Sequence, residues 1–146
     1  HGDDPGGIQW GSAVDGDHIY AAIGHVNNRT PYKLPSGQVI TGGSWAALDP
    51  ATGEIEWQTP DPQGEADLGA LTVANGVLYA GSMAHTGNEM YALDTSTGEI
   101  LWEFPAGGSV VAGPAVVDGT VYWGSGYART GGSGNNQFFA FSRGGK

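Results

Sequence analysis

Short stretches in which apolar and polar residues alternate recur along this chain, and turn-forming pairs separate them. At three places an Asp-Gly or Asn-Gly pair precedes an apolar-aromatic stretch, and such pairs between alternating runs predict β-hairpins. The pairs are Asp15-Gly16, Asn75-Gly76 and Asp118-Gly119. No window holds the i, i+3, i+4, i+7 apolar spacing of a helix. The pattern therefore predicts an all-β protein.

An eleven-residue phrase occurs twice, with its two copies 45 positions apart. Residues 47–57 and 92–102 both fit A-x-D-x-x-T-G-x-x-x-W. The Asp-x-x-Thr-Gly part closes a tight hairpin, because the polar side chains can bond the turn's own amides and Gly supplies a positive φ. The Trp lies on the next strand, where its flat face can pack between neighbouring sheets. A period near 45 is typical of β-propeller blades.

The repeat predicts about two and three-quarter blades of four-stranded antiparallel sheet, which are part of a single β-propeller domain over residues 1–146. Blade one spans 8–58, blade two 68–104, and an incomplete blade three 110–142, without an outermost strand. A loop from Gly24 to Gly43 accounts for the extra length of blade one. The expected strands, from the innermost outward, are 8–13, 18–23, 44–48 and 54–58; then 69–73, 77–81, 90–93 and 100–104; then 112–117, 120–124 and 137–141.

A propeller closes on itself with roughly four to eight blades, and this chain supplies fewer than three. Two sheet faces lined with apolar side chains would then lack a neighbour. We expect the remaining blades to come from the same polypeptide, if the chain is a piece of a longer one, or from other copies that assemble into a ring. Both alternatives stay open at this point.

Charge and composition limit the kinds of partner that this protein can bind. The formal net charge is −10 and the sequence pI is about 4.4. Such a surface repels nucleic acid and anionic membranes, because phosphate binding needs basic patches. The chain has no cysteine, and no apolar run approaches the roughly 18 residues of a membrane span. We expect no nucleic-acid partner and no membrane insertion, and the composition fits a periplasmic or extracellular bacterial protein.

The repeated phrase resembles the tryptophan-docking motif of the pyrroloquinoline quinone (PQQ) dehydrogenases, the bacterial quinoprotein alcohol dehydrogenases. Within that family the chain is most similar to the polyvinyl-alcohol-dehydrogenase-like branch. The resemblance covers nearly all 146 residues and includes the segments 121–127 and 136–142. The same repeat occurs in non-catalytic relatives, such as the outer-membrane assembly propeller lipoproteins. The resemblance thus implies the fold, and the function depends on the site.

In the PQQ dehydrogenases the flat quinone stacks on an indole at the mouth of the central channel. A calcium or lanthanide ion polarises its carbonyl, and a carboxylate helps to remove the alcohol proton. Residues 6–11 resemble the Gly-Gly-x-x-Trp-Gly segment under the quinone, which implies cofactor binding by Trp10 and Gly11. Residues 65–68 resemble the segment with the base aspartate, which implies that Asp67 is the catalytic base and a metal ligand. Alternatively, Trp10 is an inner-strand core residue and Asp67 an exposed loop acid.

Three positions depart from the family pattern. His25 stands where many relatives carry a metal-binding Asn, and imidazole is a poor ligand for calcium. Asn27 or Asn28 could substitute if the loop shifts, and Asn27 is the second expected metal ligand. Residues 85–88 lack the arginine that contacts the quinone in some relatives, and Val111 replaces an Asn. Together these departures indicate an altered or absent quinone site.

The sequence therefore supports two functions. The first is a segment of a PQQ-dependent alcohol dehydrogenase, which oxidises a small or polymeric alcohol by hydride transfer to the quinone with metal assistance. The second is a non-catalytic propeller that binds partners or assembles with itself and has lost the cofactor.

Overall fold

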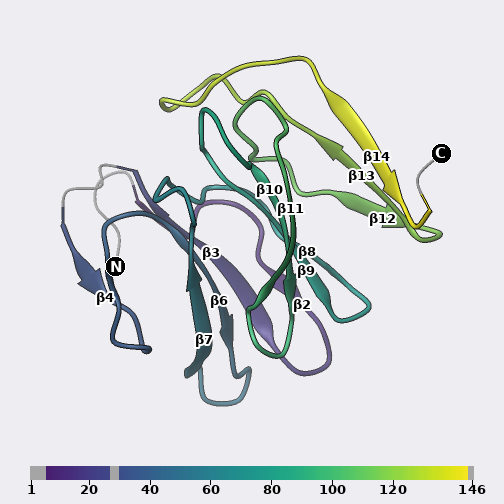
Figure 1. Ribbon diagram of the computed structural model, residues 1–146. Helices are drawn as coiled ribbons and strands as arrows, with labels where there is room; N and C mark the ends of the chain where they lie inside the picture. Colours follow the sequence, from purple (N-terminus) through teal and green to yellow (C-terminus); the bar gives the residue numbers. More distant parts are fainter. Residues whose placement is uncertain (1–5, 27–29, 145–146) are drawn as a thin grey trace.

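The computed structural model describes residues 6–26 and 30–144, and they form three larger antiparallel sheets that follow one another along the chain, with a small two-stranded sheet beside them (Figure 1). Within these residues no helix is long and apolar enough to cross a membrane. The all-β prediction and the propeller-blade architecture are confirmed.

The first sheet has strand order β1-β3-β6-β7, and β2 also pairs with β3. The second sheet runs β11-β10-β9-β8, and the third has only three strands, in the order β12-β13-β14. The bounds in the first sheet are β1 Gly6–Gly7, β2 Ala13–Val14, β3 Ile19–His25, β6 Ser44–Leu48 and β7 Ile55–Pro60. Those in the other two sheets are β8 Thr72–Ala74, β9 Val77–Gly81, β10 Met90–Asp94, β11 Ile100–Phe104, β12 Ala115–Val117, β13 Thr120–Gly124 and β14 Phe138–Ser142.

The innermost strands are shorter than the sequence predicts. The expected strand 8–13 is wrong: two short pieces, β1 and β2, pair with opposite ends of β3, and residues 8–12 lie between them outside any strand. The strands expected from 69 and from 112 begin only at Thr72 and Ala115. The reason is that the preceding backbone bonds the neighbouring unit instead. Leu71 N donates to Gly11 O and Ala70 N donates to Val111 O, both at 3.0 Å.

A second difference lies in the loop 24–43, for which the sequence predicts no strands. There β4 (Tyr32–Lys33) pairs with β5 (Val39–Ile40) in a small hairpin. The hairpin has two residues per strand, which is too short for an alternating pattern to be visible in the sequence. Leu34 and Tyr32 are nevertheless buried, so this insertion is packed against the rest of the molecule.

The repeated phrase forms the turn that its residues predict. Asp94 Oδ1 accepts hydrogen bonds from the backbone of Ser96 and Thr97, and Gly98 adopts a φ of 72°. Asp49 does the same for Ala51 and Thr52 in the first copy.

The first and second sheets each pack their front face, the side toward the next sheet along the chain, on the back face of that next sheet. Such a contact occurs twice, and each one forms a separate cluster of the hydrophobic core. The front residues of the first sheet (Tyr20, Trp45, Ala47, Trp57) meet the back residues of the second (Leu71, Leu78, Ala80, Tyr91, Leu93). The front residues of the second (Tyr79, Met90, Trp102, Phe104) meet the back residues of the third (Val116, Val121, Trp123, Phe139, Phe141). The chain thus builds an arc of stacked sheets with two uncovered ends.

Candidate functional site

Trp10 lies between β1 and β2, outside any strand, and its side chain is 52% exposed. The alternative in which Trp10 is an inner-strand core residue is therefore wrong. The next residue anchors this segment, because Gly11 O accepts the hydrogen bond from Leu71 N. The indole consequently has an open surface for a flat ligand and a fixed backbone behind it.

The segment with Trp10 and the segment with Asp67 lie side by side. A Cβ atom on Gly24 would fall 2.6 Å from Leu68 Cδ2, 3.2 Å from Gly7 O and 3.6 Å from Asp67 O. Glycine is required at position 24 because backbone from both segments closes on it. The structure thus brings together the two regions in which the sequence places the cofactor and the base.

Asp67 is completely buried, so the alternative of an exposed loop acid is wrong. Neither carboxylate oxygen accepts a hydrogen bond from a donor in the described ranges, 6–26 and 30–144. A Cβ atom on Gly43 would lie 2.7 Å from Asp67 Oδ2, which shows how tightly the carboxyl is enclosed. Burial first, and then the charge of the Asp61 carboxyl, raise the pKa of Asp67 well above its ordinary value.

Asp61 is the partner of Asp67, and the sequence gives no sign of this pairing. The Asp61 side chain is buried, and its Oδ1 accepts a hydrogen bond from Gln63 N. Burial raises the pKa of Asp61, while hydrogen bonds from Ser82 and from the Asp67 carboxyl act in the opposite direction. Protonated Asp67 can donate to ionised Asp61, whereas two ionised carboxylates would lack donors. The two carboxyls are therefore coupled, and their titration belongs to the pair.

Buried polar residues adjoin this pair. Tyr32 donates from its hydroxyl to Gly42 O at 3.0 Å, and its hydroxyl lies 3.2 Å from Ser44 Oγ. Burial raises the pKa of Tyr32, and the charge of Asp67 adds to this effect. His25 stacks on the Tyr32 ring, with ring centroids 5.2 Å apart. The family departure at His25 therefore lies in the buried neighbourhood of Asp67.

The structure does not bring together the other candidate residues. Asn27 lies outside the described residues. His85 is exposed, and Val111 is buried with its carbonyl bonded to Ala70 N. Across the part of the chain that the structure describes, no group of three or more His, Asp or Glu side chains could hold a metal ion. Asp61 and Asp67 are the two carboxyls that could contribute to one.

Glu89 is a second buried carboxyl that the sequence analysis missed. It lies between the second and third sheets, where its Oε2 accepts hydrogen bonds from Ala106 N at 2.7 Å and Gly107 N at 3.2 Å. Burial raises its pKa, although less than for Asp67 because these donors favour the ionised form. Glu89 acts as a structural clamp, whereas Asp67 has no such donors.

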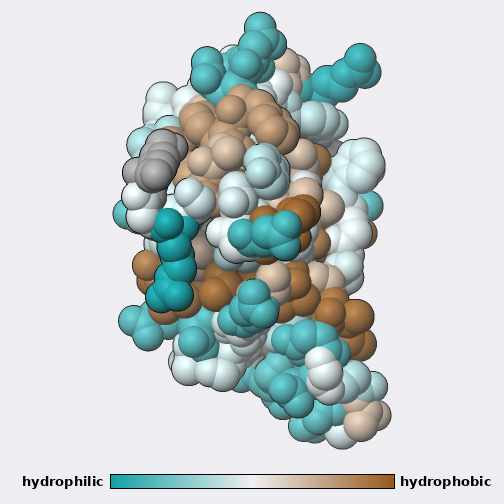
Figure 2. Space-filling view, turned by 90° about the vertical axis from the view of Figure 1, so that its right-hand side faces the viewer, coloured by the Kyte–Doolittle hydropathy of each residue, from teal (hydrophilic) through white to brown (hydrophobic). Residues whose placement is uncertain are grey.

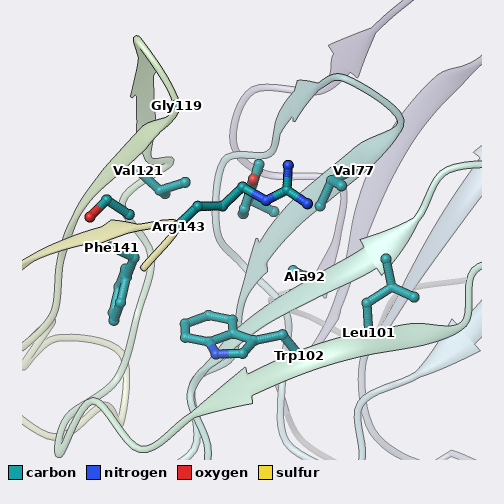
Figure 3. Close-up of a pocket in the computed structure, with 10 residues that line it drawn as sticks. Val77, Ala92, Leu101, Trp102, Gly119, Val121, Phe141 and Arg143 are labelled. Carbon is teal, nitrogen blue, oxygen red and sulfur yellow. The ribbon is translucent and has the colours of Figure 1, made fainter. Parts of the chain in front are cut away.

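Two grooves differ in their relation to these residues. One, of about 390 Å³, has Asp61 in its wall together with Gly42, Gly43 and Gln63. The other, of about 310 Å³, runs between the second and third sheets (Figure 3). Trp102 and Leu101 line one side of that groove and Val121 and Phe141 the other, and the Arg143 side chain extends across it (Figure 3). The 310 Å³ groove contains none of the sequence-predicted site residues.

The fold is that of a PQQ-repeat β-propeller protein. A sequence model of the family described as outer membrane protein assembly factor BamB matches residues 41–145, which is more than half of the chain. The chain therefore belongs to this family of PQQ-repeat propellers. No curated protein matches the sequence.

Solved structures agree on the fold. Quinohemoprotein alcohol dehydrogenase from Comamonas testosteroni superimposes with a TM-score of 0.65 at 19% identity over 94% of this chain and 20% of the enzyme. ADHIIG, a quinohemoprotein alcohol dehydrogenase from Pseudomonas putida HK5, gives 0.67 at 19% identity over 96% and 27%. BamB from Moraxella catarrhalis gives 0.50 at 20% identity over 90% and 47%. At these identities the likeness establishes the fold alone, and the chain spans only a fifth to about a quarter of the dehydrogenases.

Proposed function

We propose that this chain forms part of a PQQ-dependent alcohol dehydrogenase, with Trp10 under the quinone and Asp67 as the base. The observation that carries the proposal is the fully buried carboxyl of Asp67, which has no donor among the described residues, is paired with Asp61 and is packed against the segment of Trp10. Such perturbed carboxyls are typical of catalytic sites. Each sheet then corresponds to one blade, with the bounds 8–58, 68–104 and 110–142.

The residues present fit the quinone and a hard cation in part. The half-exposed indole of Trp10 offers a face for stacking, and the enclosed oxygens of Asp67 and Asp61 are ligands that calcium or a lanthanide accepts. Asn27 is the other ligand that the resemblance implies, whereas the imidazole of His25 is a poor ligand for such an ion. Further oxygen ligands would have to come from other parts of the assembled propeller.

The quinone, when bound, would accept the hydride of the alcohol carbon. Asp67 would receive the hydroxyl proton of a small or polymeric alcohol. Its pKa is raised by burial, so the ionised carboxylate is a stronger base than an exposed one. Asp67 and Asp61 would hold a cation as ionised carboxylates, because metal ligation requires the ionised form. Asp61 would keep the Asp67 carboxyl in place.

Quinone binding tests this proposal. PQQ is added with Ca²⁺, and tryptophan fluorescence and quinone absorption are recorded. We expect quenching that Trp10→Ala abolishes and that Asp67→Asn weakens, while Trp102→Ala, far along the chain from this site, leaves binding intact. Dye-linked alcohol oxidation should fall by roughly 10²- to 10⁴-fold in Asp67→Asn, as for loss of a general base. Quenching that survives in Trp10→Ala, or is absent with Ca²⁺ present, contradicts the assignment.

A second candidate is a non-catalytic propeller that binds partners through its uncovered sheet faces. The complete burial of Asp67 favours it, since a base must reach its substrate. Absence of quinone binding together with a stable fold would select this candidate. For either function we propose a location in the bacterial periplasm or outside the cell, as the family description, an outer-membrane assembly factor, also suggests.

A further inference from the structure

Side chains of the first sheet form a hydrogen-bonded network around His18. His18 stands directly before β3, and its Nε2 lies 2.6 Å from Glu56 Oε2 on β7. Its Nδ1 lies 3.1 Å from the Tyr20 hydroxyl, which donates to Asp15 Oδ2 at 2.7 Å. The turn itself orients Asp15, because Asp15 Oδ1 accepts hydrogen bonds from Asp17 N and His18 N. This network, the His18 clasp, is defined as Asp15, His18, Tyr20 and Glu56, and it connects the turn between β2 and β3 with the outer strand β7.

The directions of these hydrogen bonds fix the protons on the His18 ring. The Tyr20 hydroxyl gives its one proton to the Asp15 carboxylate, so His18 Nδ1 has to donate to the Tyr20 oxygen. Nε2 faces the Glu56 carboxylate, which only accepts, so Nε2 has to donate as well. Both ring nitrogens are donors only in the imidazolium ion. The clasp is therefore complete when His18 is protonated, whereas a neutral ring would turn a bare nitrogen toward an acceptor.

The charged groups that surround His18 also favour the imidazolium. Asp15 Oδ1 lies 3.9 Å from His18 Nδ1, and Asp49, in the turn after β6, interacts with the same ring. Asp17 adds a further negative charge beside the Tyr20 hydroxyl. Within residues 6–26 and 30–144 no lysine or arginine forms an ion pair with these acids. The His18 side chain is only 17% exposed, so solvent screens these interactions less than it would at an open surface.

The clasp is a property of the first sheet and not of the repeated phrase. In the second sheet Val77 stands where the first has His18, two residues before the strand tyrosine. Leu101 stands where the first has Glu56, directly before the tryptophan of the phrase. Both replacements are apolar, and both border the groove of Figure 3. Figure 2 views the molecule from the side of the third sheet, at the opposite end of the arc, and shows hydrophobic residues in a band across it.

The clasp supports the contact between the first and second sheets. Tyr20 is fully buried, and the centroid of its ring lies 6.2 Å from that of Trp57. Trp57 directly follows Glu56 on β7, and its indole NH donates to Thr95 O of the second sheet. The clasp thus orders both the ring beside Trp57 and the strand that carries Trp57.

We propose that the His18 clasp is a pH-sensitive device that strengthens the contact between the first two sheets when His18 is protonated. Histidine ordinarily changes its charge between about pH 5 and 8. The folded chain holds the imidazolium by hydrogen bonds that the unfolded chain lacks. The stability that the clasp contributes is therefore complete at the acidic end of this range and is lost as the pH rises through it. This inference goes beyond the proposed function and holds whether or not a quinone binds.

Urea unfolding across this pH range tests the device without any cofactor. The double variant His18→Val with Glu56→Leu copies the second sheet, so it should fold without the clasp. Other buried acids add their own pH dependence to both proteins, and the comparison isolates the clasp. From the acidic to the alkaline end, the unfolding constant of the wild type should rise by roughly three- to tenfold more than that of the variant, as for a partly exposed ion pair with charge-assisted hydrogen bonds. His85→Val is the matched control, because His85 is exposed and lies outside the clasp. It should keep the wild-type pH dependence.

Glu56→Gln is the milder variant, and it tests the clasp even if the double variant fails to fold. It keeps the shape of the side chain and removes the charge that Nε2 faces, so it should lose part of the extra rise. Far-ultraviolet circular dichroism confirms that each variant is folded. Wild-type pH dependence in Glu56→Gln, or in a folded double variant, would overturn the proposal. Protection of the Trp57 indole NH against hydrogen exchange should fall with rising pH more in the wild type than in either variant, and an equal fall would overturn the link to the sheet contact.

Discussion

The two sheet-to-sheet contacts in this chain use the same tryptophan in different surroundings. Trp57 is buried between the first and second sheets, and its indole NH donates to Thr95 O at 2.8 Å. Trp102 occupies the equivalent position between the second and third sheets, but it borders an open groove and finds no acceptor within residues 6–26 and 30–144. The difference shows that the tryptophan alone does not complete the contact.

The two tryptophans differ in the turn of the neighbouring sheet against which each one packs. Trp57 packs against the turn of the second copy of the repeated phrase, where a Cβ atom on Gly98 would lie 2.5 Å from the Trp57 ring. Thr59 adds a hydrogen bond from its hydroxyl to Gly98 O at 2.7 Å. After β14 the positions equivalent to Thr95 and Gly98 do not repeat the phrase, and Arg143 stands in place of Thr95. Among the described residues, the groove of Figure 3 therefore lacks the hydrogen bond and the glycine contact that Trp57 has in its turn.

Truncation of the two tryptophans should give the largest effect. Trp57→Ala should lower the free energy of unfolding by about 3–5 kcal/mol, because it leaves a cavity between two sheets that enclose the indole. Trp102→Ala should cost less, about 1–2 kcal/mol, since part of its ring surface already borders solvent. Urea denaturation of both variants measures the difference. Equal losses would show that the turn contributes little.

Glycine replacement in the two turns comes next. Gly98→Ala should destabilise by about 2–4 kcal/mol, because it combines strain at positive φ with a clash against Trp57. Gly53→Ala is the matched control: it has the same turn and a φ of 74° but no atom within 4 Å of the added Cβ. That change should cost about 1 kcal/mol, from backbone strain alone. Thermal unfolding of both proteins compares them, and a similar loss in each would contradict the clash.

The two buried carboxyls, Asp67 and Glu89, should differ in how they affect stability as the pH changes. Because the folded-state pKa of Asp67 is raised, the folded protein holds a proton that the unfolded chain releases, and stability falls as pH rises from the ordinary pKa of an aspartate through the raised value. Asp67→Asn should remove this loss and stabilise the protein at neutral pH. Glu89→Gln should instead destabilise it by about 1–3 kcal/mol, since a neutral amide oxygen accepts the bonds from Ala106 N and Gly107 N more weakly than the carboxylate and the NH₂ group takes the buried position of Oε1. Unfolding measured from acidic to neutral pH separates the two.

The smallest effect concerns the hydroxyl of Thr59. Thr59→Val keeps the shape of the side chain and removes the hydrogen bond to Gly98 O, for a loss of about 1 kcal/mol. Thr120→Val is the control, because no side-chain partner of Thr120 occurs in the described chain, and it should be close to neutral. A stability cost shared by both variants would reflect β-strand context and not the contact with the turn.

Most of the fold could be predicted from the sequence, because the turns and outer strands depend on local chemistry. The Asp-x-x-Thr-Gly phrase forms the expected turn, and the expected strands 44–48, 77–81, 100–104 and 120–124 match β6, β9, β11 and β13. The innermost strands were overestimated because Gly11 and Ala70 bond neighbouring units, and such long-range partners leave no local pattern.

The candidate site was less predictable. The resemblance pointed to Trp10 and Asp67, and the structure places their segments together. The pairing of Asp61 with Asp67 could not be foreseen, because both lie in an irregular segment where an acid is ordinarily exposed. Their burial depends on Gly42 and Gly43, whose missing side chains let the loop close over the carboxyls. The quinone and metal roles of Trp10, Gly11, Asp67 and Asn27 remain predictions.

The most direct test of the comparison between the two tryptophans is hydrogen exchange of the indole NH groups, followed by nuclear magnetic resonance. Assignment uses Trp57→Phe and Trp102→Phe. The account predicts that the Trp57 indole NH, bonded to Thr95 O, is strongly protected, while the Trp102 indole NH exchanges at close to the solvent rate. Equal protection of the two would contradict it, because the second contact would then be as complete as the first.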